Sequence, residues 1–446
     1  MTPDELKARI SEDGVEFIYA MFVEMHGKPC AKLVPVSAID DLLEVGAGFA
    51  GFAAGPLSQT PADPDVLAIP DPSSYTQLPW QPNVAALQCD ATVEGELWPY
   101  APRVILQRVM EKAAEQNLVL KAGVEAEYSL LHRNEDGSFR PADERDTSEQ
   151  PCYDARGLTV MLDHLTTVSR HMDAMGWGNY ANDHEDANGQ FEMNWDYDHC
   201  LVTADRHTFF KFMVKTIAEK HGLRATFMPK PFENLTGNGC HAHISVWDGK
   251  KNKFLDKSND LGLSKMAYNF LGGVIKNASS LSAFFNPTIN SYRRINAPPT
   301  KSGATWSPSS ISYTGNNRTH MIRIPDKGRF ELRLMDGSAN PYLLQAGIIA
   351  AGLEGINKKL NPGKPLHCNM YEDYKKYPGL KKLPNDINQA ISMLKNSKSL
   401  SNAFGSDVIK SYIKLKNSEI KNFRAKNNFN KRKPVSQWEK DNTLDC

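Results

Sequence analysis

The first hundred residues combine two periods of hydrophobic and polar positions. Residues 3–10 show the spacing of a short amphipathic helix, whereas residues 17–22 and 32–35 have the composition of strands. Residues 55–80 are rich in Pro and Gly, and the spacing of these chain breakers predicts a long ordered loop. We therefore expect a small mixed domain with a long loop, and long loops in compact domains are often functional.

Helical and strand-like periods are mixed along the rest of the chain. The Pro-containing segment at residues 98–102 interrupts the pattern, so we expect two domains, residues 1–101 and 102–446. The expected helices cover residues 103–116, 158–175, 206–221, 266–278, 343–357 and 387–394, and the expected strands cover residues 118–131, 241–247 and 328–335. This mixture favours an α+β fold over a doubly wound fold, and the Lys- and Asn-rich end of the chain predicts a solvated helical tail.

Composition narrows the class of protein. The 446 residues include 52 basic and 52 acidic side chains, a formal net charge of +0, which does not suggest a nucleic-acid or membrane-surface binder. The seven cysteines are scattered and odd in number, a pattern that fits reduced thiols. The N-terminal segment lacks the apolar core of a signal peptide, and no stretch is apolar enough to span a bilayer. We expect a cytoplasmic protein that binds neither nucleic acid nor membrane.

Two pairs of residues spaced i, i+2 are the first candidates for chemistry. In the strand-like segment GVEAEYSLL, Glu125 and Glu127 project from the same sheet face, where two carboxylates attract a hard cation. On spacing alone, an exposed alternating strand explains such a pair more often. His241 and His243 form the second pair, after glycines that let the backbone approach a ligand, and a lone His pair is more often structural.

Three more glutamates extend this set. Glu185 and Glu192 flank a Gly-containing turn that could fold both carboxylates toward one centre, and Glu331 lies on an apparent strand. Five carboxylates and an imidazole suit Mg²⁺ or Mn²⁺, because hard cations prefer oxygen ligands and a nitrogen ligand pulls mildly toward Mn²⁺. Zinc is less suited, since no cysteine or closed tetrahedral set is evident.

Arginines supply the opposite charge. Each of them alone is more often part of a surface ion pair, but together with the acidic strands they suggest phosphoryl transfer, which relies on metals and cations to stabilise charge. These residues are Arg294, Arg318, Arg323 and Arg333. The chain contains no P-loop and no kinase signature, so a nucleotide would be held by a different fold.

Eight stretches resemble the glutamine synthetase superfamily in their order and spacing. They are DPDVLAIPD (63–71), GVEAEYSLL (123–131), HEDANGQFE (184–192), ATFMPKPFENLTGNGCHAHIS (225–245), NSYRRI (290–295), NNRTHMIRIP (316–325), FELRLMDGSANPYL (330–343) and AGLEGI (351–356). The resemblance implies a small N-terminal β-grasp domain and a large catalytic domain in which helices pack on a curved antiparallel sheet, a half-barrel. It also implies ATP as co-substrate, two or three Mg²⁺ or Mn²⁺ ions per site, and a dodecamer of two stacked hexamers with active sites between subunits.

The same resemblance assigns roles to individual residues. One metal position would be held by Glu127, Glu185 and Glu192, and the other by Glu125, His241 and Glu331. The implied catalytic residues are Arg294, Arg318 and Arg333. The implied substrate-binding residues are Gly237, Arg294, Tyr153, Ala53 and Thr300, and the implied ATP-binding residues are Arg323, His243, Ser245 and Tyr197. In this family the glutamate side chain attacks the terminal phosphate of ATP, and an amine then displaces phosphate from an intermediate shielded from water.

Two departures from the family's pattern concern the amine. The family places one acidic residue in a Phe-Asp-Gly stretch and another six residues after the substrate-binding arginine, and the counterparts here are Ala53 and Thr300. Without these charges the site is less suited to ammonium and has room for an alkyl group. Residues 296–308, NAPPTKSGATWSP, resemble the γ-glutamylmethylamide synthetase branch, so we expect methylamine as the substrate.

Other activities remain open at this point. Glutamine synthesis from ammonia and γ-glutamylpolyamine synthesis are the alternatives within the class of ligases. A structural or regulatory relative without catalysis is less expected, because such proteins lose metal ligands and all six are present here. The sequence does not reveal a base for the amine, and the tail has no counterpart of the tyrosine that some relatives modify with AMP.

Overall fold

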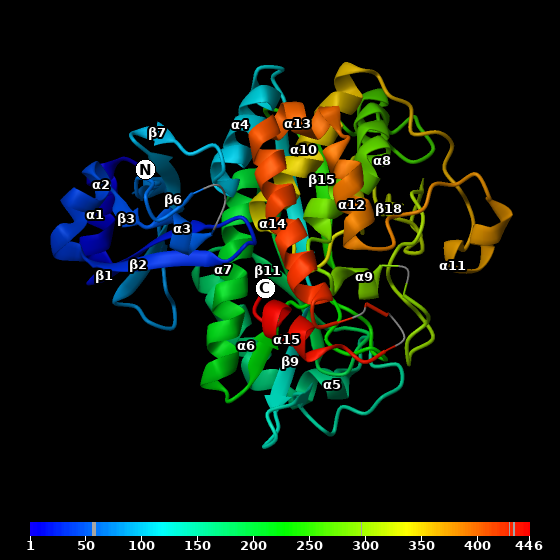
Figure 1. The fold of residues 1–446 in the computed structure, drawn as a ribbon, viewed down its shortest axis with the longest axis horizontal. Coiled ribbons are helices and arrows are strands. Elements are labelled where there is room, and N and C mark those ends of the chain that lie inside the picture. The colour runs from blue at the N-terminus through cyan, green and yellow to red at the C-terminus, as the bar shows by residue number, and fades with distance from the viewer. Residues whose placement is uncertain (56–58, 296, 428, 431–432) are drawn as a thin grey trace.

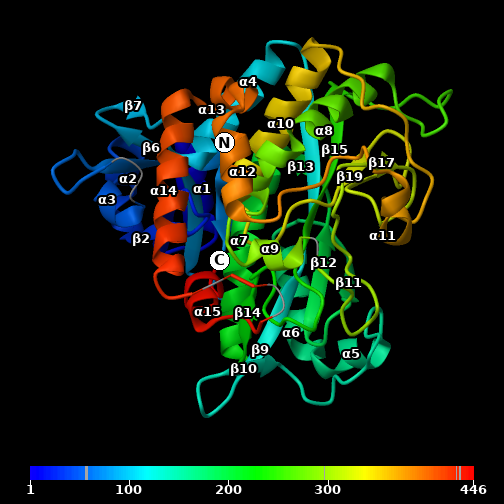
Figure 2. The same cartoon turned by 45° about the vertical axis from the view of Figure 1, so that its right-hand side comes forward.

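The computed structural model describes residues 1–55, 59–295, 297–427, 429–430 and 433–446. The N-terminal elements, drawn in blue, gather at one side of the molecule, and the remaining sheets and helices lie beside them (Figure 1). The long helix α14, Ser406–Arg424, runs down the middle of the molecule in this view and beside the N-terminal part in the view turned by 45° (Figure 2).

The N-terminal part is a seven-stranded sheet with three helices. The strand order is β2-β1-β6-β4-β3, with β5 and β7 paired to β6, and β1 runs parallel to β6. The strands are β1 Phe17–Val23, β2 Pro29–Pro35, β3 Ala47–Phe49, β4 Val66–Pro70, β5 Thr76–Gln77, β6 Val84–Val93 and β7 Glu96–Leu97. The helices are α1 Pro3–Glu12, α2 Ile39–Glu44 and α3 Gly51–Ala54. Leu6 and Ile10 of α1 are buried in the core of this part, as their helical spacing predicts.

The expected loop at residues 55–80 is wrong for part of its length. Val66–Pro70 forms β4, which pairs with both β3 and β6 and so lies inside the sheet. Val66 and Ala68 point inward and are fully buried, but two inward positions among many prolines are too few to stand out in the sequence. Residues 56–58 of the expected loop lie outside the described residues.

Two further sheets form the large part of the molecule. One has the order β10-β9-β12-β11 with β14 paired to β9, and the other has the order β13-β8-β15-β19-β18-β17 with β16 paired to β15. Their strands are β8 Val119–Ala126, β9 Tyr128–Arg133, β10 Phe139–Pro141, β11 Asn179–His184, β12 Gln190–Trp195, β13 Asp198–His199, β14 Arg224–Thr226, β15 Cys240–Asp248, β16 Lys251–Asn252, β17 Tyr313–Thr314, β18 Ile322–Arg323 and β19 Phe330–Leu332. Among the described strand pairs of these two sheets, only β17–β18 is parallel. The expected α+β class with a curved, largely antiparallel sheet is confirmed.

The expected strand at residues 118–131 is in fact two strands. β8 ends at Ala126 and β9 begins at Tyr128, and the two belong to different sheets. At the break, the backbone N–H of Glu127 donates to the Gly239 carbonyl oxygen at 3.2 Å. Because the apolar alternation continues through both strands, hydrophobic spacing alone does not reveal the break.

Helices cover the sheets of the large part. They are α4 Pro102–Ala114, α5 Ala155–Val160, α6 Leu162–Ala174, α7 Cys200–Lys220, α8 Lys265–Phe285, α9 Ser291–Arg294, α10 Pro341–Asn357, α11 Met370–Asp373, α12 Ile387–Lys395, α13 Lys398–Phe404, α14 and α15 Gln437–Thr443. The helix expected at residues 158–175 is interrupted at Met161, where φ is −114° and ψ is 18°. The tail is helical as expected, but it is not simply solvated, since Leu400 and Phe404 are fully buried. No helix of the described chain combines the length and apolarity that crossing a bilayer requires.

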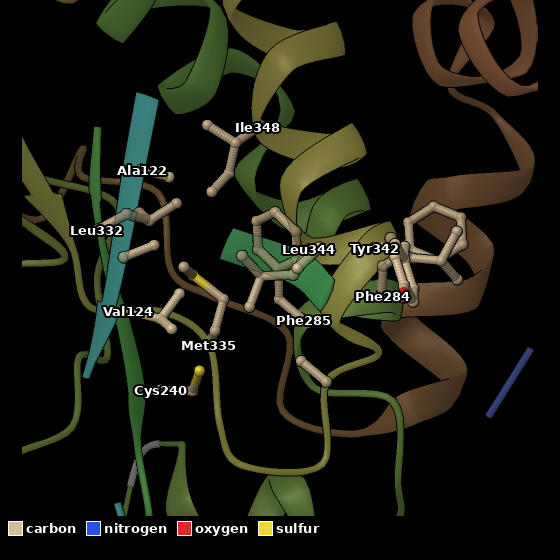
Figure 3. Packing of buried hydrophobic residues seen from close by; sticks show 14 of the residues in the cluster. Ala122, Val124, Cys240, Phe284, Phe285, Leu332, Met335, Tyr342, Leu344 and Ile348 are labelled. Carbon is tan, nitrogen blue, oxygen red and sulfur yellow. The ribbon is translucent and has the colours of Figure 1, made fainter. Parts of the chain in front are cut away.

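One face of the β8–β15–β19 sheet packs on α8 and α10. Figure 3 shows the side chains that meet there, which are Ala122, Val124, Cys240 and Leu332 of the sheet and Phe285, Leu344 and Ile348 of the helices. None of them is more than 4% exposed. Successive residues of a strand point to opposite faces, so the residues between these apolar positions must project away from the helices.

A histidine in the β1–β2 turn connects the N-terminal part to α14. His26 Nδ1 lies 2.7 Å from Glu24 Oε2, and His26 Nε2 lies 2.8 Å from Glu419 Oε1. Burial lowers the pKa of His26, but the hydrogen bonds to Glu24 and Glu419 outweigh burial and raise it from 6.5 to about 9. At neutral pH the ring is therefore charged and bridges two carboxylates.

This bridge predicts a pH-dependent contribution to stability. Because the pKa of His26 is higher in the folded protein, its contribution is complete below pH 6.5 and is lost as pH rises through about 9. The side chain is 39% exposed, so solvent screening limits the effect to about 1 kcal/mol or less. Thermal unfolding of the wild type and His26→Gln should differ most at mildly acidic pH and converge under alkaline conditions. A difference that stays constant with pH would contradict the assignment.

Candidate active site

The polar face of the β8–β15–β19 sheet is assembled by strand register. His241 of β15 lies opposite Glu125 of β8, and His243 lies opposite Glu331 of β19. Arg323 of β18 also lies opposite Glu331. Residues directly opposite on paired strands share a face, so these five side chains project together, away from the helices.

Two groups of possible metal ligands form on this face. The ligand atoms of Glu125, His241 and Glu331 all lie within 4.8 Å of one another, and those of Glu127, Glu192 and His241 do the same. The first group has the same members as one of the two expected metal positions. The second group contains two of the three glutamates expected at the other position, and His241 belongs to both groups.

The remaining expected ligand, Glu185, lines the same cavity. This cavity has a volume of about 260 Å³ and is bounded by acidic and basic walls. The residues expected from the sequence that line it are Glu125, Glu127, Glu185, Glu192, His241, Arg318, Arg323, Arg333 and Tyr153. The structure thus brings together residues from widely separated segments, including five of the six expected ligands and three of the four arginines. The sixth ligand, Glu331, accepts hydrogen bonds from two of these arginines, Arg323 and Arg333.

The carboxylates of the acidic wall, Glu125, Glu127, Glu185 and Glu192, repel one another. Burial raises the pKa of Glu185 and Glu192, and the charges of Glu125 and Glu127 raise both further. Buried like charges repel each other strongly because little water screens them. A bound divalent cation would relieve this repulsion, so the carboxylates fit a site for Mg²⁺ or Mn²⁺.

His241 has the state that metal binding requires. Burial, and then the charge of Arg333, hold its pKa below the usual value, so the ring is neutral at physiological pH. Its Nδ1 lies 3.2 Å from Glu125 Oε2. Its Nε2 is buried, lies 3.7 Å from Glu127 Oε1, and forms no hydrogen bond with the described residues. A buried nitrogen without a partner among carboxylates is the arrangement that a bound cation would complete.

The arginines form the basic wall. Glu331 is fully buried and accepts hydrogen bonds from Arg323 Nη1, at 2.8 Å, and from Arg333 Nη1. Arg318, on the same cavity, forms no ion pair with any residue in the described part of the chain. Guanidinium groups that are only partly paired can bind phosphoryl oxygens in a fixed geometry.

Two glycines let Arg294 approach the acidic wall. A Cβ atom on Gly239 would lie 2.8 Å from Arg294 Nη2 and 2.9 Å from Glu127 Oε1, and a Cβ on Gly237 would lie 2.2 Å from the Pro229 carbonyl oxygen. All three distances are below 3 Å, so a side chain at either position would require its neighbours to move. Gly237 was assigned to the site from the sequence, whereas Gly239 was noted only as one of the glycines before His241 that let the backbone approach a ligand.

A second cavity of about 450 Å³ adjoins the first and shares Glu125, Tyr180 and Asn194 with it. Three of the four residues expected to bind ATP line it, namely His243, Ser245 and Tyr197. The fourth, Arg323, lies in the first cavity. Aromatic and cationic side chains that sequence reasoning did not assign complete the wall, namely Lys121, Trp195, Trp247, Lys327 and Arg329.

The two positions where the family's acidic residues are missing lie apart from each other. Ala53 is exposed on α3 of the N-terminal part and lines neither cavity. Thr300 Oγ1 lies 3.2 Å from Thr236 Oγ1, and Thr236 lines the first cavity. Within one chain, Thr300 therefore lies close to the first cavity, whereas Ala53 does not.

Backbone strain marks two aromatic residues of the first cavity. Tyr153 has a backbone φ of 62° and Trp306 has a backbone φ of 52°, values that residues other than glycine rarely adopt. Both line the cavity. Strained residues often persist at functional sites, where the surrounding structure holds them in place. Tyr153 was expected here, but Trp306 was not, and a lone aromatic in a segment of small and polar residues is the only signal for it.

Comparisons with known proteins agree with this geometry. Residues 99–435 match the glutamine synthetase catalytic domain. The chain is 49% identical to a glutamine synthetase of Rhizobium leguminosarum bv. phaseoli over 443 residues, 99% of each chain. It is 40% identical to a glutamate–methylamine ligase of Methyloversatilis universalis over 451 residues, 100% of each chain. A solved structure described as a complex of GmaS with ADP superimposes with a TM-score of 0.91 at 50% identity, covering 99% of both chains.

The two relatives and the solved structure each match at least 99% of this chain, which is enough to establish its family. The acidic and basic walls lie inside the matched catalytic region, since every ligand and arginine named above falls within residues 99–435. The chain belongs to the glutamine synthetase family of ATP-dependent carbon–nitrogen ligases.

Proposed function

We propose that this protein joins the side-chain carboxylate of glutamate to methylamine, through γ-glutamyl phosphate, with formation of γ-glutamylmethylamide. The observation that carries the proposal is a complete set of metal ligands and phosphoryl-binding arginines beside an amine position without its two acidic residues, at Ala53 and Thr300. The relatives named as a glutamate–methylamine ligase and as GmaS support it.

In this proposal the metal sites belong to the acidic wall. Glu125, His241 and Glu331 would hold one cation, and Glu127 and Glu192 with Glu185 would hold another. The bound cations would neutralise the phosphate charges of ATP and position its terminal phosphate. We assign the 450 Å³ cavity to the nucleotide, because the GmaS structure was solved with ADP and the expected ATP-binding residues line that cavity.

The basic wall would serve both steps of the reaction. Arg294, beside Gly237, would hold glutamate so that a γ-carboxylate oxygen attacks the terminal phosphorus of ATP and ADP leaves. Arg318 and Arg333 would stabilise the negative charge of the transferring phosphoryl group. The nitrogen of the uncharged amine would then attack the γ-carbonyl carbon, the bond from this carbon to the phosphate oxygen would break, and the released phosphate would take up the proton that the nitrogen loses. Tyr153 would contact the substrate from the strained loop.

We further propose that the enzyme assembles as a dodecamer in the cytoplasm. In one chain Ala53 lies outside both cavities, and a ring arrangement would let the N-terminal part of a neighbouring subunit close the site. We also place the boundary between the N-terminal and catalytic domains at residues 101 and 102, before α4.

A second candidate function is glutamine synthesis, because the Rhizobium relative named as a glutamine synthetase shares 49% of its residues with this chain. Phosphate release from ATP and glutamate, measured in parallel with methylamine, ethylamine, ammonia and putrescine, separates the two. We expect kcat/KM for methylamine to exceed that for ammonia by about tenfold or more, the difference that one buried methyl group produces. Equal or faster turnover with ammonia would favour glutamine synthesis, and a preference for putrescine would favour polyamine ligation.

A further inference from the structure

A buried pair of an aspartate and a histidine lies behind the turn that carries Glu185. Asp146, in the loop after β10, has its Oδ2 2.9 Å from Nε2 of His184, the last residue of β11. The two side chains are 2% and 0% exposed, and neither residue lines the 260 Å³ or the 450 Å³ cavity. Burying a carboxylate is costly unless hydrogen bonds satisfy it, so the other partners of Asp146 show what this residue holds.

Asp146 fixes the turn between β11 and β12. Its Oδ2 also accepts a hydrogen bond from the backbone N–H of Gly189 at 2.6 Å, and its Oδ1 accepts one from Asn188 Nδ2 at 3.0 Å. Gly189 has φ of +73°, a left-handed conformation that glycine adopts without strain. One carboxylate therefore binds both the start and the end of the turn.

His184 connects this carboxylate to the first cavity. Its Nδ1 lies 2.8 Å from the carbonyl oxygen of Glu185, and its own carbonyl oxygen accepts a hydrogen bond from the backbone N–H of Tyr153 at 2.8 Å. Helix α5 packs closely on the ring, since a Cβ atom on Gly157 would lie 2.4 Å from His184 Cδ2. The ring has little room to turn, so the peptide that follows it is held in one position.

The repulsion within the acidic wall gives this restraint a purpose. The charges of Glu127 and Glu125 act on Glu185, and a flexible turn would let its carboxylate move away from them before a cation arrives. Each binding event would then include the entropic cost of ordering the turn again. A turn that is fixed from behind keeps the ligand in place, and such supporting contacts increase metal affinity.

We propose that Asp146 and His184 are positioning residues that hold Glu185 in the metal site and so set the affinity of the cation position formed with Glu127 and Glu192. This inference rests on the proposed function, which assigns Glu185 to that position, and adds two residues that contact neither substrate nor cation. Among the described residues, no hydrogen bond of the pair reaches a ligand of the other cation position. The pair should therefore act on one of the two positions.

The test is titration calorimetry of the full-length protein with Mn²⁺, without ATP, glutamate or amine, in Asp146→Asn. Asparagine keeps the shape of the side chain, but its amide NH₂ must replace one of the two accepting oxygens, so the turn loses at least one hydrogen bond. We expect one Mn²⁺ site to weaken about tenfold or more and the other to change by less than about threefold. The Mn²⁺ concentration that gives half-maximal turnover should rise in parallel, while turnover at saturating Mn²⁺ changes less.

Asp143→Asn is the matched control from the same loop. Asp143 binds Arg145, whose side chain is 63% exposed, and this variant should bind Mn²⁺ as the wild type does. Asn188→Ala is a milder variant, because it removes only one hydrogen-bond partner of the Asp146 carboxylate. It should weaken the same Mn²⁺ site by a smaller factor, and it tests the inference even if Asp146→Asn does not fold.

Thermal unfolding of the same variants separates positioning from general stability. A lower unfolding temperature with unchanged Mn²⁺ binding, or equal weakening of both Mn²⁺ sites, would show that the pair only stabilises the fold and would overturn the inference. Because the titration contains no amine, its result does not depend on which amine the enzyme uses. A wild type that binds no Mn²⁺ would overturn the metal assignment on which both proposals rest.

Discussion

Replacing Glu331 with Gln should reduce turnover by about a thousandfold or more while the protein stays folded. Glu331 is fully buried, lies opposite His243 in the sheet, and accepts hydrogen bonds from Arg323 and Arg333. With Gln in its place, the proposed metal site loses one negative charge, and both arginines lose the anion that orients them. Glutamine has nearly the same shape, so the fold is affected less than by Ala, which would leave the buried guanidinium group of Arg333 without its carboxylate partner.

Two measurements separate loss of metal from loss of fold. Mn²⁺ binding, followed by titration calorimetry, should weaken in Glu331→Gln, while size-exclusion chromatography and circular dichroism remain as in the wild type. Glu354→Gln is the matched control, because Glu354 also has two cationic partners, Lys276 and Lys358, but lies outside both cavities. Wild-type turnover in Glu331→Gln would remove the metal assignment.

Replacing Arg103 with Met should lower the free energy of unfolding by about 3–5 kcal/mol. Arg103 of α4 is 3% exposed and binds three carboxylates, with distances of 2.7 Å to Asp71, 2.6 Å to Asp90 and 3.0 Å to Asp205. Asp71 and Asp90 belong to the N-terminal part, and Asp205 lies on α7. Methionine would fill much of the space but leave three neighbouring carboxylates without this cation, so their repulsion would separate the N-terminal part from the large part.

Urea unfolding at one fixed protein concentration measures this effect, because any association of subunits would make the stability depend on concentration. Arg9→Met serves as the control. Arg9 also pairs with an aspartate, Asp13, but its side chain is 53% exposed, so its loss should lower the stability much less than the loss of Arg103. Similar changes in the two variants would show that the buried cluster contributes no more than a surface ion pair.

The polar face of the sheet could be predicted from the sequence because strand periodicity is local. The i, i+2 spacing of Glu125 and Glu127 and of His241 and His243 predicts which side chains share a face. Register is not local, and spacing alone does not show that Glu125 lies opposite His241. The resemblance to a known family provided that information for the ligands and arginines.

Other features depend on tertiary contacts that no local pattern records. The break between β8 and β9 is held by a hydrogen bond from Glu127 to Gly239, more than a hundred residues away. Asp146 looks like one more polar residue in a loop until the structure brings His184 and Gly189 to it. β4 was missed because its two inward residues stand among prolines. These omissions share one cause, since each feature is defined by partners distant in the chain.

The pleat that divides β15 into two chemically different faces makes the length of this strand as important as its composition. Deleting or inserting a single residue within it would turn His241 and His243 toward α8 and α10, and would present Ala242 to the cations and phosphates instead. The sheet would then lose its packing against α8 and α10 and, at the same time, the polar side chains of its other face. Changes in length should be tolerated only beyond the strand, at the β15–β16 turn around Gly249, where φ is +56° and a Cβ would meet nothing within 4 Å.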